Sequence, residues 1–203
     1  QAMGTEETTA QLSPARFADA LWADAQHRLG ASLATSACTA LEFETPSPGD
    51  ETAAKMATLV RLANGETLHA DHVVLAAGPW TGRAVASMGL GSALPVDGEK
   101  VHSVVFRLDR PLSPAACLFL EFRDEHGVSS PEVYPRPDGQ VYVCGETQPD
   151  APVPETAAVV KPKPGACERL RRIAGSACPA LAAARVEAEQ ACFLPTTPDG
   201  LPL

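Results

Sequence analysis

The sequence has no apolar run long enough to cross a membrane, and no signal peptide opens it. It also lacks a basic stripe, since 16 Lys and Arg residues stand against 25 Asp and Glu, for a net charge of −9. Nucleic acid is therefore not an expected partner, and the acidic surface argues mainly for solubility. No GxSxG elbow and no phosphate-binding loop occurs, so two common catalytic signatures are absent.

The 6 cysteines form neither a CxxC pair nor a zinc-binding pattern. The chain is too large and too sparse in cysteine for a disulfide framework, so we expect reduced, buried thiols. The 5 histidines are scattered along the chain. His69 and His72 flank Asp71 at a hairpin end, which is a poor cage for a metal, and no metal site is expected.

The first part of the chain alternates helical and extended segments. Ser13 before Pro14 predicts a helix with a capping hydroxyl, and an apolar stripe follows until Gly30 ends it. We expect a strand over residues 32–43. The Asn-Gly pair at 64–65 predicts a hairpin across 55–70, with positive φ angles at the turn.

The next segment, residues 73–78, has the apolar character of a strand buried on both faces, and a helix is expected after it. Beyond residue 94 the pattern changes to strands joined by tight turns, including Pro137-Asp138-Gly139. A proline-rich stretch, a helix and a final strand follow. The segments expected are strands at 100–108, 117–123, 131–136, 140–145 and 185–194, and a helix at 164–177.

Three stretches carry a resemblance to a known family. They are residues 70–81, which contain Ala-Ala-Gly-Pro-Trp; the middle of the chain, residues 99–103 and 131–145; and residues 193–202, which contain Thr-Pro-Asp-Gly-Leu-Pro. In this order they resemble FAD-dependent oxidoreductases of the D-amino-acid-oxidase-like superfamily. With residues 9–14, they are similar to a eukaryotic branch without defined substrates, some of whose members are linked to endosomal recycling.

The resemblance implies an α/β fold: a partial, Rossmann-like FAD-binding scaffold with an inserted, mainly antiparallel substrate domain. The expected divisions are a partial FAD-binding domain (5–93), the sheet domain (94–148), and a linker, helix and strand that return to the first domain (149–203). It further implies a location inside the cell, in association with endosomes.

The resemblance also implies which residues lie near the cofactor, FAD. A turn of small residues lets backbone approach a ligand closely, although the same residues also permit close strand–helix packing. Asp-Gly likewise forms ordinary turns in many proteins. The expected cofactor-side residues are Cys38, Thr39, Ala76, Ala77, Gly78, Trp80, Asp199 and Gly200.

Candidates for catalysis come from the middle of the chain. Lys100 and His102 alternate onto one face of a strand, where they either contact substrate or simply face water. Tyr134 and Arg136 are further candidates, together with Tyr142, because a guanidinium suits a bidentate carboxylate contact. A structural role for each of these residues remains the alternative.

Two features depart from the family pattern. The chain contains no GxGxxG motif, and it stops soon after the Asp-Gly turn, so we expect an internal fragment that binds flavin weakly or not at all. Leu194 also stands where the family has an arginine. The leading hypothesis is a parent enzyme that oxidises a C–N bond of a small-molecule amine or amino acid. The alternative is a non-catalytic protein of the same fold that acts in membrane trafficking.

Overall fold

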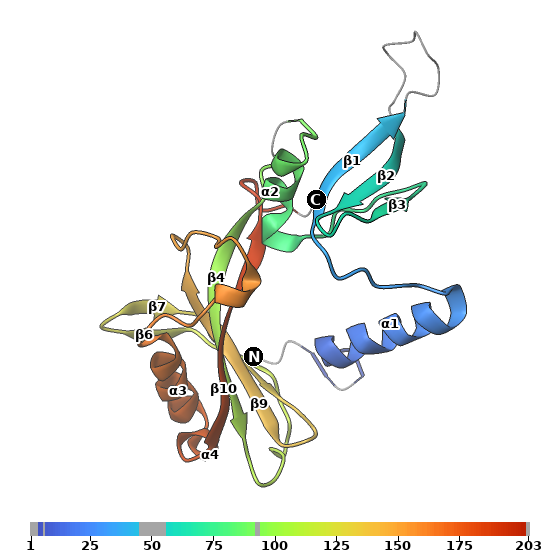
Figure 1. Ribbon diagram of the computed structural model, residues 1–203. Coiled ribbons are helices and arrows are strands. Elements are labelled where there is room, and N and C mark those ends of the chain that lie inside the picture. Colours follow the sequence, from blue (N-terminus) through green and yellow to red (C-terminus); the bar gives the residue numbers. More distant parts are fainter. Residues whose placement is uncertain (1–3, 6, 45–55, 92–93, 202–203) are drawn as a thin grey trace.

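The computed structural model describes residues 4–5, 7–44, 56–91 and 94–201. A small three-stranded sheet (β1-β2-β3) lies at one end and a five-stranded antiparallel sheet (β10-β4-β9-β8-β5) at the other, as Figure 1 shows. The helical elements are α1 (Pro14–Leu29), η1 (Gly78–Trp80), α2 (Thr81–Ser87), η2 (Ala157–Val159), α3 (Ala166–Ala177) and α4 (Pro179–Ala182). The strands are β1 (Cys38–Glu44), β2 (Met56–Leu62), β3 (Thr67–His69), β4 (Asp97–Arg107), β5 (Leu118–Phe119), β6 (Phe122–Asp124), β7 (Gly127–Ser129), β8 (Glu132–Pro135), β9 (Gln140–Gln148) and β10 (Arg185–Thr196).

The five-stranded sheet holds the core because its central strands alternate apolar side chains onto one face. Val104 and Phe106 on β4 and Val143 on β9 are at most 1% exposed, and α3 covers them with Leu170. Figure 1 shows α3 and α4 on one side of this sheet and α1 on the other. The strands predicted at 100–108, 131–136, 140–145 and 185–194, the turn before Gln140 and the predicted helix are confirmed. The single strand predicted at 117–123 was wrong, because this segment is divided into β5 and β6, which belong to different sheets.

Strand β10 pairs antiparallel with β4 along its whole length, from Arg185 opposite Arg107 to Thr196 opposite Asp97. Helix α3 also packs on β4 and β9. The helix and the final strand within residues 149–203 therefore pack with the large sheet. The sequence could not reveal this, because the pairing joins residues from 78 (Arg107 and Arg185) to 99 (Asp97 and Thr196) positions apart.

A β-bulge shapes the centre of the sheet. The register between β4 and β9 shifts between His102 and Ser103, and Gly145 lies at that point with φ of 120°. A Cβ on Gly145 would lie 2.7 Å from Pro131 Cα. Glycine therefore lets β9 bend closely past the start of β8.

The hairpin predicted around Asn64-Gly65 is confirmed as β2–β3. Only Gly65 has a positive φ, 88°, whereas Asn64 does not, so the expectation for Asn64 was wrong. The Asn64 side chain instead joins the turn, because its Oδ1 accepts the Glu66 N–H at 3.1 Å. The strand expected over 32–43 begins only at Cys38, and Lys55 lies outside the described residues.

The segment 73–78 does not form the expected buried strand. It runs without a strand partner in the described structure, and the Val74 side chain is 86% exposed. A strand needs hydrogen-bonding neighbours and a layer over each face to be buried, and no described segment supplies them here. The helix expected next is confirmed as η1 followed by α2.

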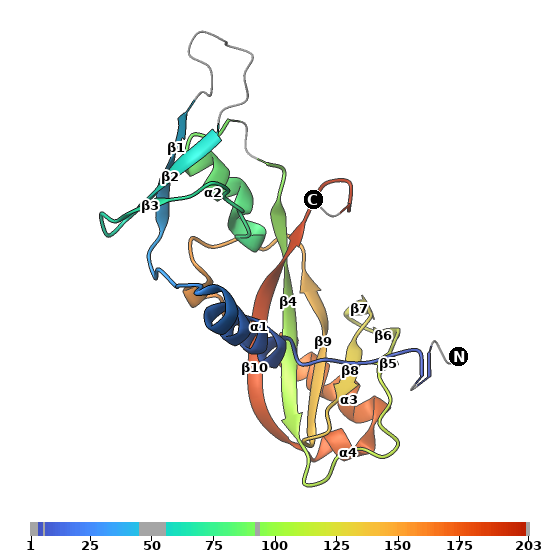
Figure 2. The same cartoon turned by 90° about the vertical axis from the view of Figure 1, so that its right-hand side faces the viewer.

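Helix α1 is confirmed between Pro14 and Gly30, which ends it with φ of 66°. The Ser13 side chain makes no capping hydrogen bond, contrary to expectation. The apolar stripe does not pack against described residues either, since Phe17 is 52% and Leu29 81% exposed. Figure 2 shows α1 crossing in front of the large sheet, on the side opposite α3.

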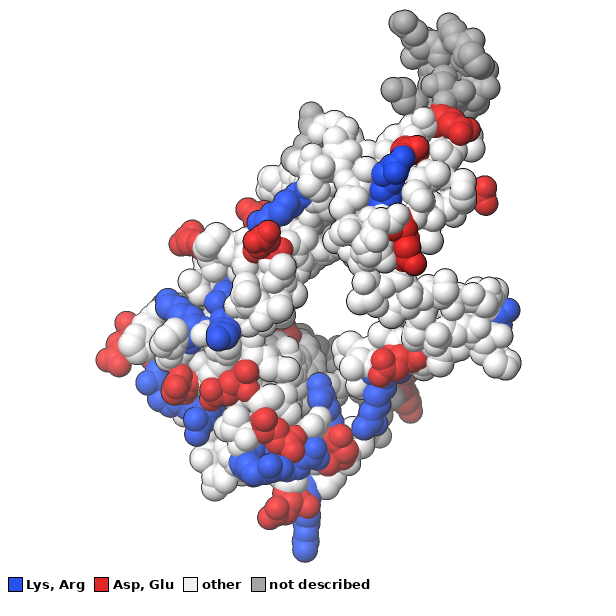
Figure 3. Space-filling view, in the orientation of Figure 1, with Lys and Arg blue, Asp and Glu red and all other residues white. Residues whose placement is uncertain are grey.

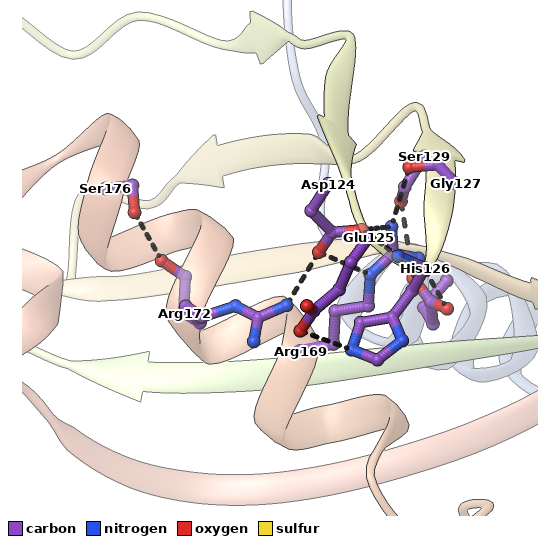
Figure 4. Close-up of polar contacts among 9 residues, drawn as sticks. Asp124, Glu125, His126, Gly127, Ser129, Arg169, Arg172 and Ser176 are labelled. Atoms are coloured by element: carbon purple, nitrogen blue, oxygen red, sulfur yellow. Dashed lines mark hydrogen bonds and ion pairs between the residues drawn. The ribbon is translucent and has the colours of Figure 1, made fainter.

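Ion pairs also join helix α3 to the β6–β7 hairpin and to β9. Arg169 contacts Asp124 at 2.8 Å and Glu146 at 2.8 Å, and its side chain is 11% exposed. Arg172 reaches the same Asp124 at 2.6 Å but is 51% exposed. Figure 4 shows Asp124 between the two arginines.

All six cysteines are free, as expected, but their predicted burial is only partly correct. Cys167 is buried, whereas Cys38, Cys117 and Cys192 are exposed. In the part of the chain that the structure describes, no helix combines the length and the apolar character of a membrane span.

Candidate functional site

The large sheet has one face covered by α3 and one face that α3 leaves uncovered, which we call the open face. Side-chain alternation and the cross-strand register identify its members. They are Asp97, Glu99, Val101, Ser103 and Val105 on β4, Gln190, Cys192, Leu194 and Thr196 on β10, Tyr142 and Cys144 on β9, and Glu132 and Tyr134 on β8.

The aromatic part of the open face brings Tyr134 and Tyr142 together, with ring centroids 6.3 Å apart. The Tyr134 hydroxyl donates to Glu132 Oε2 at 2.6 Å, and this bond to a carboxylate raises the pKa of Tyr134. Burial raises the pKa of Tyr142 and also raises that of Cys144, to about 11. These groups therefore stay protonated at neutral pH and act as hydrogen-bond donors rather than as bases.

Arg136 joins this group at the end of β8. Its guanidinium carbon lies 5.6 Å from the Tyr142 ring centroid, and Nη1 donates to Gln140 Oε1 at 2.7 Å. It also lines a shallow hollow with Gln11, Leu12 and Arg16 of the N-terminal segment. Among the described residues Arg136 has no carboxylate partner, so its charge is available to an anion.

His102 does not belong to this site. It is 1% exposed on the face that carries α3, where Nδ1 donates to the Glu146 carbonyl at 2.8 Å. Nε2 accepts the Lys163 N–H at 3.0 Å, so both ring nitrogens are engaged. Lys100 alternates onto the same face as His102. The sequence predicted that Lys100 and His102 share one face of the strand. It did not predict that this is the face covered by α3, because alternation alone does not say which face is covered.

In the expected cofactor turn, Ala76 and Ala77 are exposed and Gly78 is half-buried. Ala76 and Ala77 carry only methyl groups, and a Cβ on Gly78, whose φ is 55°, would meet nothing within 4 Å. A backbone of small residues that nothing covers is what close approach of a dinucleotide requires, so these residues fit the cofactor. The structure leaves the turn free rather than using it for strand–helix packing.

The other expected cofactor-side residues lie in two further places. Cys38 and Thr39 open β1 in the small sheet, where the Thr39 hydroxyl donates to the Arg61 carbonyl at 3.2 Å. Asp199 and Gly200 form a turn just after β10. There Asp199 Oδ1 accepts the Leu201 N–H at 3.1 Å, a bond that lowers the pKa of the Asp199 carboxyl.

The turn at η1 is tied to the large sheet by contacts that sequence reasoning missed. The Pro154 carbonyl accepts Trp80 Nε1 at 2.7 Å and Arg83 Nη1 at 3.0 Å, and Arg83 Nη2 donates to the Val153 carbonyl at 3.0 Å. A Cβ on Gly98, at the start of β4, would lie 3.0 Å from Pro79 Cβ and 2.8 Å from Val153. The indole N–H of Trp80, which was expected beside the cofactor, is used in this junction, and its place relative to the cofactor stays a prediction.

We expect Arg83→Met to loosen the junction. The variant loses two hydrogen bonds to carbonyls, each worth about 1 kcal/mol net at a partly exposed site. Arg83→Lys is the matched control, because an ammonium keeps the charge but cannot make the same forked contact. In Arg83→Met, the fluorescence of Trp80 should shift to that of an exposed indole at a lower denaturant concentration than in the wild-type chain. An unchanged Trp80 transition in both variants would contradict the junction's role.

The space-filling view shows a hollow between the two ends of the molecule. It is bounded by α1, by the small sheet and by the large sheet (Figure 3). Both expected cofactor turns lie toward one end of the large sheet, because η1 contacts β4 and β10 and the Asp199 turn follows Thr196. We call this the near end, and the end at Arg107 and Gln140 the far end.

Comparisons with known proteins agree with this architecture. A curated relative, "Putative oxidoreductase C1F5.03c" of Schizosaccharomyces pombe, is 27% identical over 201 residues, which are 95% of this chain and 50% of that protein. A glycine oxidase of Pseudomonas putida is 32% identical over 145 residues, 71% of this chain and 35% of that protein. The chain spans half or less of the length of these relatives.

Among solved structures, glycine oxidase from Geobacillus kaustophilus matches with a TM-score of 0.63 and 22% identity. The match covers 90% of this chain and 42% of that one. It confirms the expected fold class, a mixed α/β scaffold with an antiparallel sheet. The family model described as "DAO: FAD dependent oxidoreductase" matches residues 2–203. The chain therefore belongs to the DAO family of FAD-dependent oxidoreductases.

Proposed function

We propose that the full-length protein oxidises the C–N bond of a small-molecule amine or amino acid with FAD as the electron acceptor. The observation that carries this proposal is the small-residue turn Ala76–Gly78, in which Ala76 and Ala77 are exposed and which leads into η1 at the near end of the large sheet. Relatives named for glycine oxidation support the substrate class. Ala76–Gly78, Asp199 and Gly200 would hold the cofactor, with the start of β1 as a further contact.

When bound there, FAD would supply the two-electron acceptor for oxidation of the C–N bond, and oxygen or another acceptor would regenerate it. The task of this chain is to orient the substrate on the open face. Tyr134, Tyr142 and Cys144 remain protonated on this face, and Tyr134 donates its hydroxyl proton to Glu132. No group among them serves as a base, which agrees with a reaction that needs orientation more than proton removal.

The cofactor assignment is tested by a matched pair of variants in the full-length protein. Gly78→Val places a branched side chain on the expected dinucleotide turn, whereas Gly65→Val makes the same change at another left-handed glycine with open space around it. We expect Gly78→Val to weaken flavin binding at least roughly tenfold, because a blocked approach removes several contacts. Equal flavin content, from absorbance near 450 nm, in both variants would refute the assignment.

We further propose that the 203 residues alone do not retain FAD and are inactive. The expected contacts come from three separate places, and Ala76, Ala77 and Gly200 are exposed in the structure. FAD bound to such an open surface would bury only a small part of its own surface, and burial of the ligand is a main source of affinity. A yellow, stoichiometric flavin complex of the isolated chain would contradict this proposal.

A second candidate is a non-catalytic protein that acts in trafficking at endosomes. The feature that favours it is α1, whose apolar side chains Phe17, Leu21 and Leu29 are more than half exposed. The two candidates make opposite predictions for flavin-loaded, full-length protein. Flavin reduction by an amine or amino acid under anaerobic conditions supports the first, and its absence across a broad panel supports the second.

A further inference from the structure

The open face changes in charge from its near end to its far end. At the near end the side chains of Asp97 and Glu99 alternate onto it, whereas Glu132, which pairs with Cys144 opposite Ser103, lies nearer its middle. Leu194 lies directly across from Glu99 and is 48% exposed. Along the described part of this face, from Asp97 to Tyr142, there is no lysine or arginine.

The available guanidinium of Arg136 lies at the far end. It bonds Gln140, which pairs with Arg107 on β4, eight residues along the strand from Glu99. At about 3.3 Å per residue, that separation is roughly 26 Å, well beyond the reach of an arginine side chain. Arg136 therefore cannot contact a carboxylate group that lies at Leu194.

We propose that the substrate is a cationic amine with no carboxylate beside the oxidised C–N bond, and that Glu99 and Leu194 determine this specificity. The inference rests on the proposed function, because the near end is where both expected cofactor turns lie. An ammonium group is attracted by Asp97 and Glu99, whereas an α-carboxylate at the same place is repelled by them. Leu194 offers an apolar surface to the carbon chain of the amine.

The reaction balances without a carboxylate contact. The carbon beside nitrogen loses a hydride to FAD, the N–H proton goes to solvent, and the C–N single bond becomes a double bond. Water then adds to the imine and releases a carbonyl compound and the remaining amine. Molecular oxygen or another two-electron acceptor takes the electrons from the reduced flavin, so no group beyond these is required.

The experiment compares two compounds that differ only in the α-carboxylate. These are N-methylbutylamine and N-methylnorvaline, each offered to the flavin-loaded full-length protein. We expect kcat/KM for the amine to exceed that for the amino acid by at least roughly tenfold, which corresponds to one close repulsion between carboxylates at a partly exposed site. Equal values, or a preference for the amino acid, would overturn the inference.

Variants connect the preference to the named residues. Glu99→Gln should reduce the preference several-fold, and the double variant Glu99→Gln with Leu194→Arg should reverse it, because a guanidinium then lies at the near end without an internal partner. Glu125→Gln is the matched control, since Glu125 is 81% exposed on the β6–β7 turn, away from the open face. The inference fails if Glu99→Gln and Glu125→Gln change the preference equally.

A binding measurement separates this inference from the proposed reaction. Trimethylbutylammonium and butanoate are compared by calorimetry with the full-length protein. Tighter binding of the cation supports the charge preference, and tighter binding of butanoate overturns it, whether or not the flavin is reduced. If the cation binds tighter and no amine reduces the flavin, the proposed function is contradicted while the charge preference stands.

Discussion

Leu170→Ala is expected to lower the free energy of unfolding by about 3 kcal/mol, because it removes the apolar contact that joins α3 to the large sheet. Leu170 is 0% exposed and packs with Val104, Phe106 and Val143. The truncation loses the transfer free energy of the removed carbons and leaves a cavity that a rigid antiparallel sheet cannot close. Denaturant unfolding followed by circular dichroism measures the change.

The control is the same substitution at the end of α1. Leu29→Ala also replaces leucine with alanine, but Leu29 is 81% exposed, so the isolated chain should change by less than about 0.5 kcal/mol. Equal effects at the two positions would show that α3 does not form the core of this chain. A change in m-value in Leu170→Ala alone would instead indicate that the native state had loosened.

The sequence correctly predicted the elements for which the spacing of apolar residues and the turn-forming residues at the ends indicate the same structure. Helix α3 was expected because Leu170 and Ile173 lie on one helical face, and both are at most 1% exposed. The hairpin at Gly65 and the turn at Gly139 were expected because each glycine stands between two strand-like runs, and both have positive φ. Local chemistry decides such features, so a single sequence is enough to find them.

The wrong predictions about burial depend on a partner surface that the local sequence does not identify. The run around Val74 was expected to be buried and is 86% exposed, and the stripe at Phe17 is 52% exposed. In both cases the apolar pattern is real, but burial needs a second surface. The prediction for His102 was wrong in the opposite sense. This polar residue was expected at the site or in water, but it is buried and bonded to Glu146 and Lys163.

The candidate site was predicted in part. Tyr134, Arg136 and Tyr142 do lie together on the open face, as their spacing along β8 and β9 indicates. The junction of Trp80 with Pro154 was not foreseen, because it joins residues 74 positions apart through a side-chain N–H and a backbone carbonyl. No motif marks such a contact. The one available signal was Gly98, a glycine at the start of a strand where another backbone approaches.

Arg169→Met is expected to lower the free energy of unfolding by roughly 2 kcal/mol, since it leaves the carboxylates of Asp124 and Glu146 without their main partner. Both acids are less than one fifth exposed, so water replaces the lost contacts only in part. Arg172→Met is the matched control. Arg172 is 51% exposed and pairs with Asp124 alone, so its loss should cost less than about 1 kcal/mol.

The pH dependence of the free energy of unfolding tests the ion pair between Arg169 and Asp124 in a second way. The hydrogen bond from Arg169 lowers the pKa of Asp124 to about 2, below its ordinary value of 3.8. A carboxyl whose pKa is lower in the folded state contributes stability above its unfolded pKa and loses it as the pH falls through the folded value. The wild-type chain should therefore lose this contribution between about pH 4 and pH 2. In Arg169→Met the free energy of unfolding should fall less steeply with decreasing pH in this range. An identical slope in the two proteins below pH 4, measured by denaturant unfolding at each pH, would show that Arg169 does not hold Asp124 in its ionised form.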